Sequence, residues 1–180
     1  MSTSWKVSAK YLKSMAGALR SLALEDRLEG LSSQTRTALQ TPHTQSWWPG
    51  ELLIELVTRL GNEKAREVSI RASRDGMGPL VRPLASVVLA LTRSPVEALL
   101  SKLSAFVGAG VQGVESRVAY KDGGAGATVS FVFPEPVPVE LAAVWVGLFD
   151  VGFSLAKAGR IVSEHAEPTT HRFEVSFLVG

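Results

Sequence analysis

Hydrophobic residues recur every three or four positions through the first part of the chain, from Trp5 to about Gly108. This spacing is that of one face of a helix. Near the N-terminus the residues that follow it are Val7, Tyr11, Met15, Leu19 and Leu22. Turn-forming residues interrupt the pattern at Gly30, Thr41-Pro42, Trp48-Pro49-Gly50, Gly61 and Gly76 to Pro79. We therefore predict five or six short to medium helices in this part of the chain.

The clearest helix start is the sequence SPVE at Ser94 to Glu97. The Ser94 hydroxyl can cap the helix, Pro95 suits its first position, and the Glu97 carboxylate can reach back to the capping amide. This helix is expected to continue to Phe106 and to end near Gly108.

Beyond Gly113 the hydrophobic period changes from helical to alternating. The stretches VESRVAY and TVSFVF flank the glycine-rich turn KDGGAG, which predicts a β-hairpin. Prolines at positions 134, 136 and 138 are expected to end its second strand. The stretches IVSEHAE and HRFEVSFL, on either side of Pro168, predict a second hairpin.

A long apolar segment, Val139 to Gly159, separates the two hairpins. As a membrane span it would place Asp150 near the bilayer centre, at a cost of roughly 2.5–3.5 kcal/mol. We therefore predict no membrane span and a central helix that is covered on most sides. The fold class is α+β, in which a helical part (1–108) packs as one integrated domain with an antiparallel ββ-α-ββ part (109–180).

Small residues are spaced along this predicted helix. Ala143 and Gly147 are four apart, as are Gly152 and Ala156. Such spacing lets another backbone come close, and that backbone could belong to the sheet, to an N-terminal helix or to a second copy of the chain. Asp150 on the same helix needs a partner if it is buried, and the sequence does not identify one.

Two adjacent tryptophans precede Pro49-Gly50. Neighbouring residues on a helix are about 100° apart, so Trp47 and Trp48 cannot both point from a helix into one core. Either one of them covers a crevice or contacts a partner, or both are buried in a loop junction, which is the more common arrangement. The candidate interaction surface consists of Trp47, Trp48, Ala143, Gly147, Asp150, Gly152 and Ala156.

Composition excludes several classes of function. The chain has 180 residues, of which 46% are hydrophobic and 20% charged, which is typical of a folded globular protein. Its net charge of +2 gives no support to nucleic-acid binding. The N-terminus carries lysines among its apolar residues and lacks the apolar run of a signal peptide, so a cytoplasmic location is expected.

Candidate catalytic and cofactor motifs are weak. The sequence GAGVQG at 108–113 matches GxGxxG, but it follows a helix and precedes a strand, the reverse of the order that dinucleotide binding needs. His165, Glu167 and His171 could together bind a metal, although histidines beside a turn are more often solvated. The motifs GxSxG, GxxxxGK and HExxH are absent. We predict no catalytic residue, no cofactor and no metal site.

Several segments carry a family resemblance. The stretches SWWPGELL, REVSIRASRDGMGPL, LTRSPVEALLSKL, VWVGLFDVGFSLAKAG and HRFEVSFLV resemble an uncharacterised family of paralogous myxobacterial proteins of about this length. The resemblance covers most of the chain and consists of diffuse hydrophobic patterns.

From SPVEALL to RFEVSF the order of elements is also similar to haem nitric-oxide/oxygen-binding domains and to vinyl-4-reductase-type small-molecule-binding domains. The haem resemblance implies a histidine between Leu99 and Phe106 and a tyrosine–serine–arginine triplet near Phe131 to Pro136, and the chain has neither. Some vinyl-4-reductase-type domains hold zinc through cysteine, and the chain has no cysteine. The resemblance therefore implies the fold without its haem or zinc.

These observations lead to two hypotheses. The first is a non-enzymatic cytoplasmic regulatory or protein-interaction module that forms a homodimer or binds a protein partner. The alternative is a sensor domain that binds a small apolar ligand, without haem, between the long helix, the sheet and the N-terminal helices. Pockets of this kind have few polar anchors, so a sequence does not reveal them.

Overall fold

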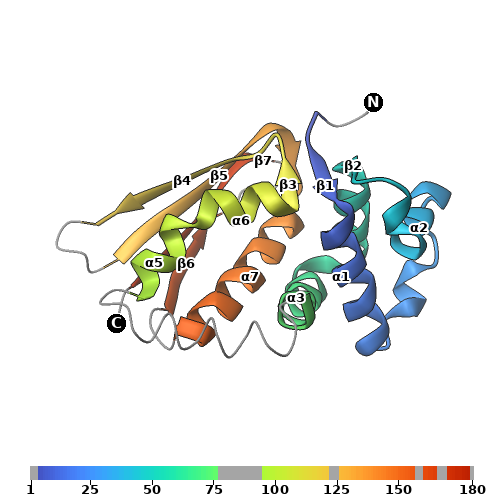
Figure 1. The fold of residues 1–180 in the computed structure, drawn as a ribbon, viewed down its shortest axis with the longest axis horizontal. Helices are drawn as coiled ribbons and strands as arrows, with labels where there is room; N and C mark the ends of the chain where they lie inside the picture. The colour runs from blue at the N-terminus through green and yellow to red at the C-terminus, as the bar shows by residue number, and fades with distance from the viewer. Residues whose placement is uncertain (1–3, 77–94, 122–125, 157–159, 166–169, 179–180) are drawn as a thin grey trace.

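Helices build the N-terminal part of the molecule, on the right of Figure 1. The computed structural model describes residues 4–76, 95–121, 126–156, 160–165 and 170–178. The N-terminal elements are α1 (Ala9–Ser21), the 3-10 helix η1 (Glu25–Leu28), α2 (Ser33–Gln40), the 3-10 helix η2 (Pro42–Thr44) and α3 (Glu51–Gly76). The predicted helical character of this part is confirmed.

Helix α1 begins later than its hydrophobic spacing indicates. Ser8 caps it by accepting a hydrogen bond from the Tyr11 amide at 3.2 Å. Val7, which the sequence pattern placed on the helix, lies instead on β1 (Lys6–Ser8) and is fully buried. The spacing misassigned Val7 because a buried strand residue three or four positions before a helical residue matches the helical period.

A small antiparallel sheet joins the two parts of the chain. Strand β1 lies between β2 (Trp47–Pro49) and β3 (Val111–Gln112), in the order β2-β1-β3. Val7 pairs with Trp48 on one side and with Val111 on the other. The sequence pattern does not reveal these strands, because two or three residues are too few to establish an alternation.

Helix α3 is bent at Gly61. This glycine has φ 75° and ψ 167°, a conformation that other residues rarely adopt, and the helix resumes directly after it. The predicted break at Gly61 is therefore confirmed, because the stretch Glu51–Gly76, labelled α3, consists of two helices that meet at a kink at this glycine.

The C-terminal part is an antiparallel sheet with helices against it. Its strands are β4 (Glu115–Tyr120), β5 (Gly126–Val137), β6 (Arg160–His165) and β7 (Thr170–Leu178), in the order β4-β5-β7-β6. Both predicted hairpins are confirmed. The prediction that prolines end β5 early is wrong, because the strand includes Pro134 and Pro136 and reaches Val137. Its register with β7 shifts between Val132 and Val137, where these prolines have no amide hydrogen to donate.

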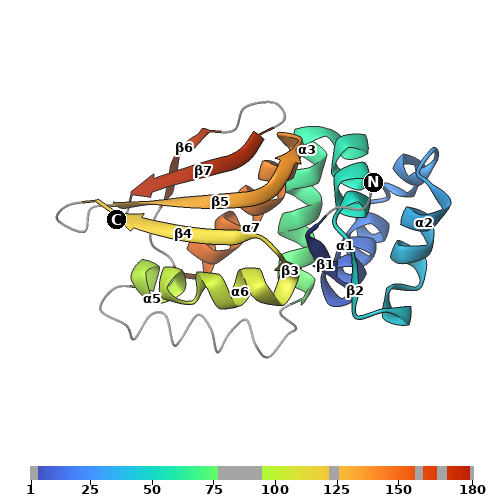
Figure 2. The same ribbon diagram turned by 90° about the horizontal axis from the view of Figure 1, so that it is seen from above.

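The helix that was predicted to start at SPVE is divided in two. Helix α5 (Pro95–Ser101) begins at Pro95 as predicted, and Ser94 lies outside the described residues. After Lys102 a second helix, α6 (Leu103–Gly110), runs to Gly110, two residues beyond the predicted end. Figure 2 shows both helices along one side of the sheet, beside β4.

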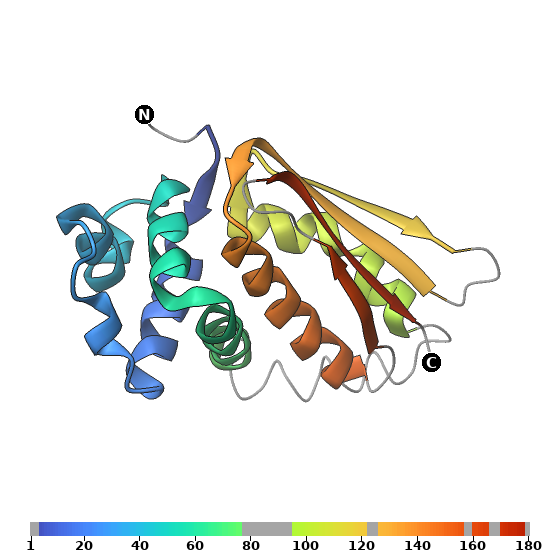
Figure 3. The same ribbon diagram turned by 180° about the vertical axis from the view of Figure 1, so that it is seen from behind.

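Helix α7 (Glu140–Ala156) is the predicted central helix, and it lies between α3 and the sheet (Figure 3). On the sheet side the Trp145 ring stacks on Phe131 of β5, with centroids 4.5 Å apart. On the other side Gly147 faces α3. The helix is apolar because both sides are covered. Within the described ranges, no helix combines the length and the hydropathy that crossing a membrane requires.

Residues of both parts share one hydrophobic core cluster. It includes Trp5 and Leu53 from the helical part and Phe133 and Trp145 from the ββ-α-ββ part. Trp5 contacts Phe133 edge to face, with ring centroids 5.4 Å apart. That the two parts fold as one integrated domain stays a prediction.

Gly50 permits the tightest contact of this core. A Cβ atom at Gly50 would lie 2.3 Å from Cε2 of Trp5. We therefore expect Gly50→Ala to lower the free energy of unfolding by about 1–3 kcal/mol, measured by urea denaturation. Gly17→Ala is the matched control, because nothing lies within 4 Å of an added Cβ in the middle of α1. It should stabilise the protein by about 0.5–1 kcal/mol, and equal stability of the two variants would contradict the packing described.

Candidate functional site

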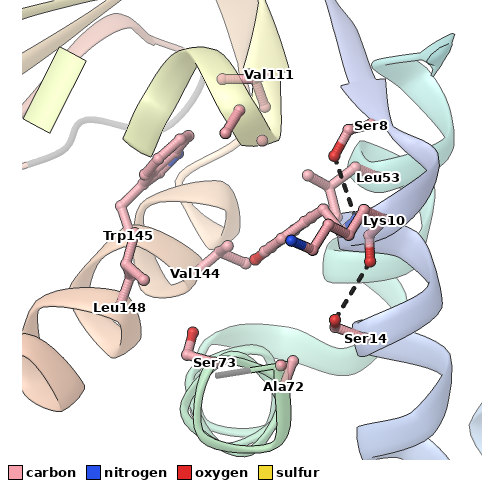
Figure 4. A pocket seen from close by; sticks show the side chains of 14 residues that line it. Ser8, Lys10, Ser14, Leu53, Ala72, Ser73, Val111, Val144, Trp145 and Leu148 are labelled. Atoms are coloured by element: carbon pink, nitrogen blue, oxygen red, sulfur yellow. Dashed lines mark hydrogen bonds between the residues drawn. The ribbon is translucent and has the colours of Figure 1, made fainter. Parts of the chain in front are cut away.

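A cavity of about 250 Å³ lies where α1, α3, α6 and α7 meet (Figure 4). Its wall is mostly apolar, and the larger apolar side chains are Leu53, Val111, Val144, Trp145 and Leu148. The polar side chains are Ser8, Lys10, Tyr11, Ser14 and Ser73. Both parts of the chain thus contribute to one wall.

The cavity lies between most of the elements that the ligand-binding hypothesis named. The long helix and the N-terminal helices line it, as that hypothesis expected. The four-stranded sheet, however, contributes none of the described lining residues, since Trp145 and the rest of α7 lie between the sheet and the cavity. The end of α6 and residues of the small sheet complete the wall instead.

A chain of hydrogen bonds crosses three helices beside the cavity. The fully buried Ser69 of α3 donates its hydroxyl proton to the Val144 carbonyl oxygen of α7 at 2.6 Å. The Tyr11 phenol of α1 also hydrogen-bonds to Ser69. These two hydrogen bonds connect α1, α3 and α7 through a single serine, Ser69.

Burial of the phenol raises the pKa of Tyr11 to about 12, and the hydrogen bond with Ser69 offsets part of the shift. Tyr11 as a whole is partly exposed. The burial that raises its pKa is therefore that of the phenol oxygen, which contacts Ser69. The neutral phenol is therefore the form present at neutral pH.

Trp145 places an unpartnered donor beside the cavity. Its side chain is 6% exposed, and its indole nitrogen Nε1 is buried without a hydrogen-bond acceptor among the described residues. Figure 4 shows the ring extending from α7 toward Val111 of β3, the residue that directly follows α6. A buried donor left without an acceptor costs about 1–3 kcal/mol, so an acceptor that reached this nitrogen from the cavity would stabilise the protein.

Gly147 and Asp150 join α7 to α3 within one chain. A Cβ atom at Gly147 would lie 2.9 Å from the Arg66 carbonyl oxygen and 3.0 Å from Cβ of Ser69. Of the three backbones that the sequence left open, the N-terminal helix is the one in contact. Asp150 pairs with Arg66, whose Nε and Nη2 atoms both lie 2.8 Å from Oδ2. The partner that the sequence could not identify is therefore Arg66.

The other small residues of the predicted interaction surface do not gather around Gly147. Ala143 is partly buried and packs against the core, Gly152 is partly buried, and the side chain of Ala156 lies outside the described residues. Because Gly147 contacts α3, a large side chain there would disturb internal packing first. Self-association through the remaining positions stays a prediction.

The two tryptophans point to opposite sides of a strand, not around a helix. Trp48 is 3% exposed, and its indole nitrogen donates to the Pro42 carbonyl oxygen at 3.0 Å. Trp47 is partly exposed. Successive side chains of β2 alternate between faces, which explains why one is buried and the other is not. A partner contact for Trp47 stays a prediction.

The histidine pair is not assembled as a metal site in the described part of the chain. His165 pairs with Glu174 in the sheet register, so it does not lie opposite His171. The His171 ring is exposed and its Nδ1 lies 3.4 Å from the Phe133 carbonyl oxygen. Glu167 lies outside the described residues. Among those that are described, no cluster of three potential metal ligands occurs.

Comparison with known proteins shows the fold. No protein-family model matches the chain, and no curated protein matches its sequence. The structure of a mutant of the Fe(II) unliganded H-NOX protein from K. algicida is similar over 96% of both chains, with a TM-score of 0.63 and 8% identity. The same protein without the mutation has a TM-score of 0.60 at 8% identity and the same coverage.

An oxygen-binding H-NOX domain related to soluble guanylate cyclases is similar over 92% of this chain and 90% of its own, with a TM-score of 0.51 and 10% identity. The chain therefore has the H-NOX fold, as one of the two layout resemblances implied. The resemblances to the myxobacterial family and to vinyl-4-reductase-type domains stay predictions.

The residues around the cavity do not fit haem. Haem iron takes an axial histidine, cysteine, methionine or tyrosine, and Tyr11 is the only residue of these types among the described lining residues. Burial raises the pKa of this phenol to about 12, so Tyr11 stays protonated at neutral pH, whereas iron takes a phenolate. The volume of about 250 Å³ also lies just below the range of about 300–1,000 Å³ that small-molecule pockets span. The cavity therefore suits a ligand smaller than a porphyrin.

The raised pKa of Tyr11 predicts a loss of stability at high pH. The unfolded chain releases the phenol proton near the usual pKa of 10, and the folded protein only near 12. The stabilisation of the neutral phenol is therefore complete below about pH 10 and is lost as pH rises toward 12. Denaturation midpoints across this range should fall less steeply for Tyr11→Phe than for wild type.

The chain offers a matched control, because Tyr120 is the only other tyrosine and is 49% exposed. In Tyr120→Phe, where Tyr11 is the sole phenol, phenolate absorbance of the folded protein should rise with a midpoint near 12. A midpoint near 10 in that variant would show that the phenol is solvated.

Proposed function

We propose that the protein is a haem-free sensor domain that binds a small, mostly apolar molecule in the cavity between α1, α3, α6 and α7. The observation that supports this most directly is the cavity itself, which has a volume of about 250 Å³ and is lined largely by apolar side chains. Natural ligand pockets combine such walls with a few placed polar groups, here Lys10, Tyr11 and Trp145.

The position of the cavity suits a sensor. Its wall comes from both parts of the chain, and these parts are joined nearby by the Ser69–Val144 hydrogen bond and the Arg66–Asp150 ion pair. A ligand shifts a conformational equilibrium only if it binds the two states differently. A molecule held between α1 and α7 has different contacts when these helices move apart, so its binding is coupled to their relative position.

The fold comparison supports a ligand-binding role but does not identify the ligand. The similar solved structures include an oxygen-binding H-NOX domain, and one fold hosts many different sites. The ligand proposed for this cavity is smaller than haem, because the residues present do not fit haem. The proposed role of the protein is regulatory, without a chemical step of its own. Association with a second copy or another protein is a separate prediction that could carry the signal onward.

Xenon provides a direct test, because dry apolar cavities in proteins bind it. We expect saturable xenon binding by the wild-type protein, measured from the ¹²⁹Xe chemical shift against protein concentration. Leu148→Trp should fill the cavity and remove most of this binding, and Leu148→Ala should enlarge the cavity and strengthen it. Ser154→Trp is the matched control, since Ser154 is exposed on the same helix.

Unchanged xenon binding in Leu148→Trp would overturn the proposal, as would wild-type protein without saturable binding and without co-purified mass. If a cellular ligand occupies the cavity, native mass spectrometry should show non-covalent extra mass in wild type and in Ser154→Trp. That mass should be absent from Leu148→Trp.

A further inference from the structure

We infer that the ligand of this cavity is a small carboxylic acid with an apolar body, bound as its anion. The inference rests on the proposed function and adds the chemical class of the ligand. Three features of the wall lead to it: its charge, its hydrogen-bond donors and the orientation of α1.

Lys10 is the only charged residue among the described lining residues. Figure 4 shows its side-chain nitrogen turned toward the α7 side of the cavity. Lys10 forms no ion pair with a described residue, whereas nearby acidic groups on α3 and α7 are engaged, Asp75 with Arg71 and Asp150 with Arg66. An anion at the cavity mouth would therefore meet an ammonium group that is not already neutralised.

The polar groups of the wall include donors whose protons have no acceptor among the described residues. The Trp145 indole N–H is buried and lacks an acceptor among the described residues. The Ser8 hydroxyl oxygen accepts from the Tyr11 amide, which leaves its proton available. The Ser14 proton is already directed at the Lys10 carbonyl oxygen. A carboxylate only accepts hydrogen bonds, so it complements this set better than an alcohol or an amine does.

The N-terminal end of α1 also faces this region. Ser8 is the N-cap, Lys10 lies in the first turn, and that turn contains no acidic residue. The positive end of the helix dipole is therefore not offset by a side chain of its own first turn. This field has the same sign as the Lys10 charge, and both favour an anionic ligand end near α1.

The apolar end of the ligand would lie against α3 and α7. Leu53, Val144 and Leu148 line that side, and a volume of about 250 Å³ accommodates a short alkyl chain or a single ring. This arrangement leaves the ligand in contact with both parts of the chain.

The test compares hexanoate with hexanamide, which has the same length and no charge, as competitors of xenon in the ¹²⁹Xe measurement. Hexanoate is expected to displace xenon at about tenfold lower concentration than hexanamide. Lys10→Gln should abolish this preference while hexanamide displaces xenon as before. Lys13→Gln is the matched control, because Lys13 is exposed on the same helix and does not line the cavity.

A second variant tests the indole donor. Trp145→Phe keeps an aromatic ring to stack on Phe131 and removes the N–H. It should weaken hexanoate displacement several-fold, by about the strength of one hydrogen bond to a charged group. Trp47→Phe, at a partly exposed site outside the cavity wall, should leave the displacement unchanged.

The outcomes separate the two proposals. Equal displacement by hexanoate and hexanamide, or a preference that survives Lys10→Gln, overturns the carboxylic acid and leaves the cavity as a binding site. Saturable xenon binding that neither compound displaces also rejects the acid. Failure of xenon to bind protein that has no co-purified mass rejects the proposed function itself.

Discussion

The close approach of α7 to α3 is the contact on which the rest of the structure depends. It requires glycine at 147, because a Cβ there would lie 2.9 Å from the Arg66 carbonyl oxygen. About one turn to either side of Gly147 on α7, Ser69 donates to the Val144 carbonyl oxygen and Arg66 pairs with Asp150. The ion pair is about one-third exposed and contributes modestly, whereas the buried serine bond and the backbone contact determine how the two helices meet.

The cavity follows from this contact. Helix α1 is held to α3 and α7 through the Tyr11–Ser69 hydrogen bond, and α6 is held by β3 pairing with β1. These links position four elements around a space that their apolar side chains do not fill. The donors left at its wall, Lys10 and Trp145, belong to elements that are fixed by other contacts. A ligand would therefore meet a wall that is already arranged, which lowers the entropy lost on binding.

The chain has the H-NOX fold, but the residues that line its cavity do not fit haem. The fold therefore does not determine which ligand binds. The sheet order and the central helix need only alternating strands and an apolar helix, and diverse sequences provide these, as identities of 8–10% show. A haem site needs an axial ligand at one position, and the α5 and α6 segments of this sequence contain no histidine.

The α+β class, both hairpins, the central helix and the helix start at Pro95 were determined by the sequence, because each depends on local periodicity or on a short capping pattern. Only the tertiary structure decided that Val7 lies on a strand, that Asp150 pairs with Arg66, and that Gly147 contacts α3. These contacts join residues up to 104 positions apart, as in the pairing of Val7 with Val111. The cavity was likewise decided only by the tertiary structure, because a space between four elements leaves no periodic pattern in the sequence.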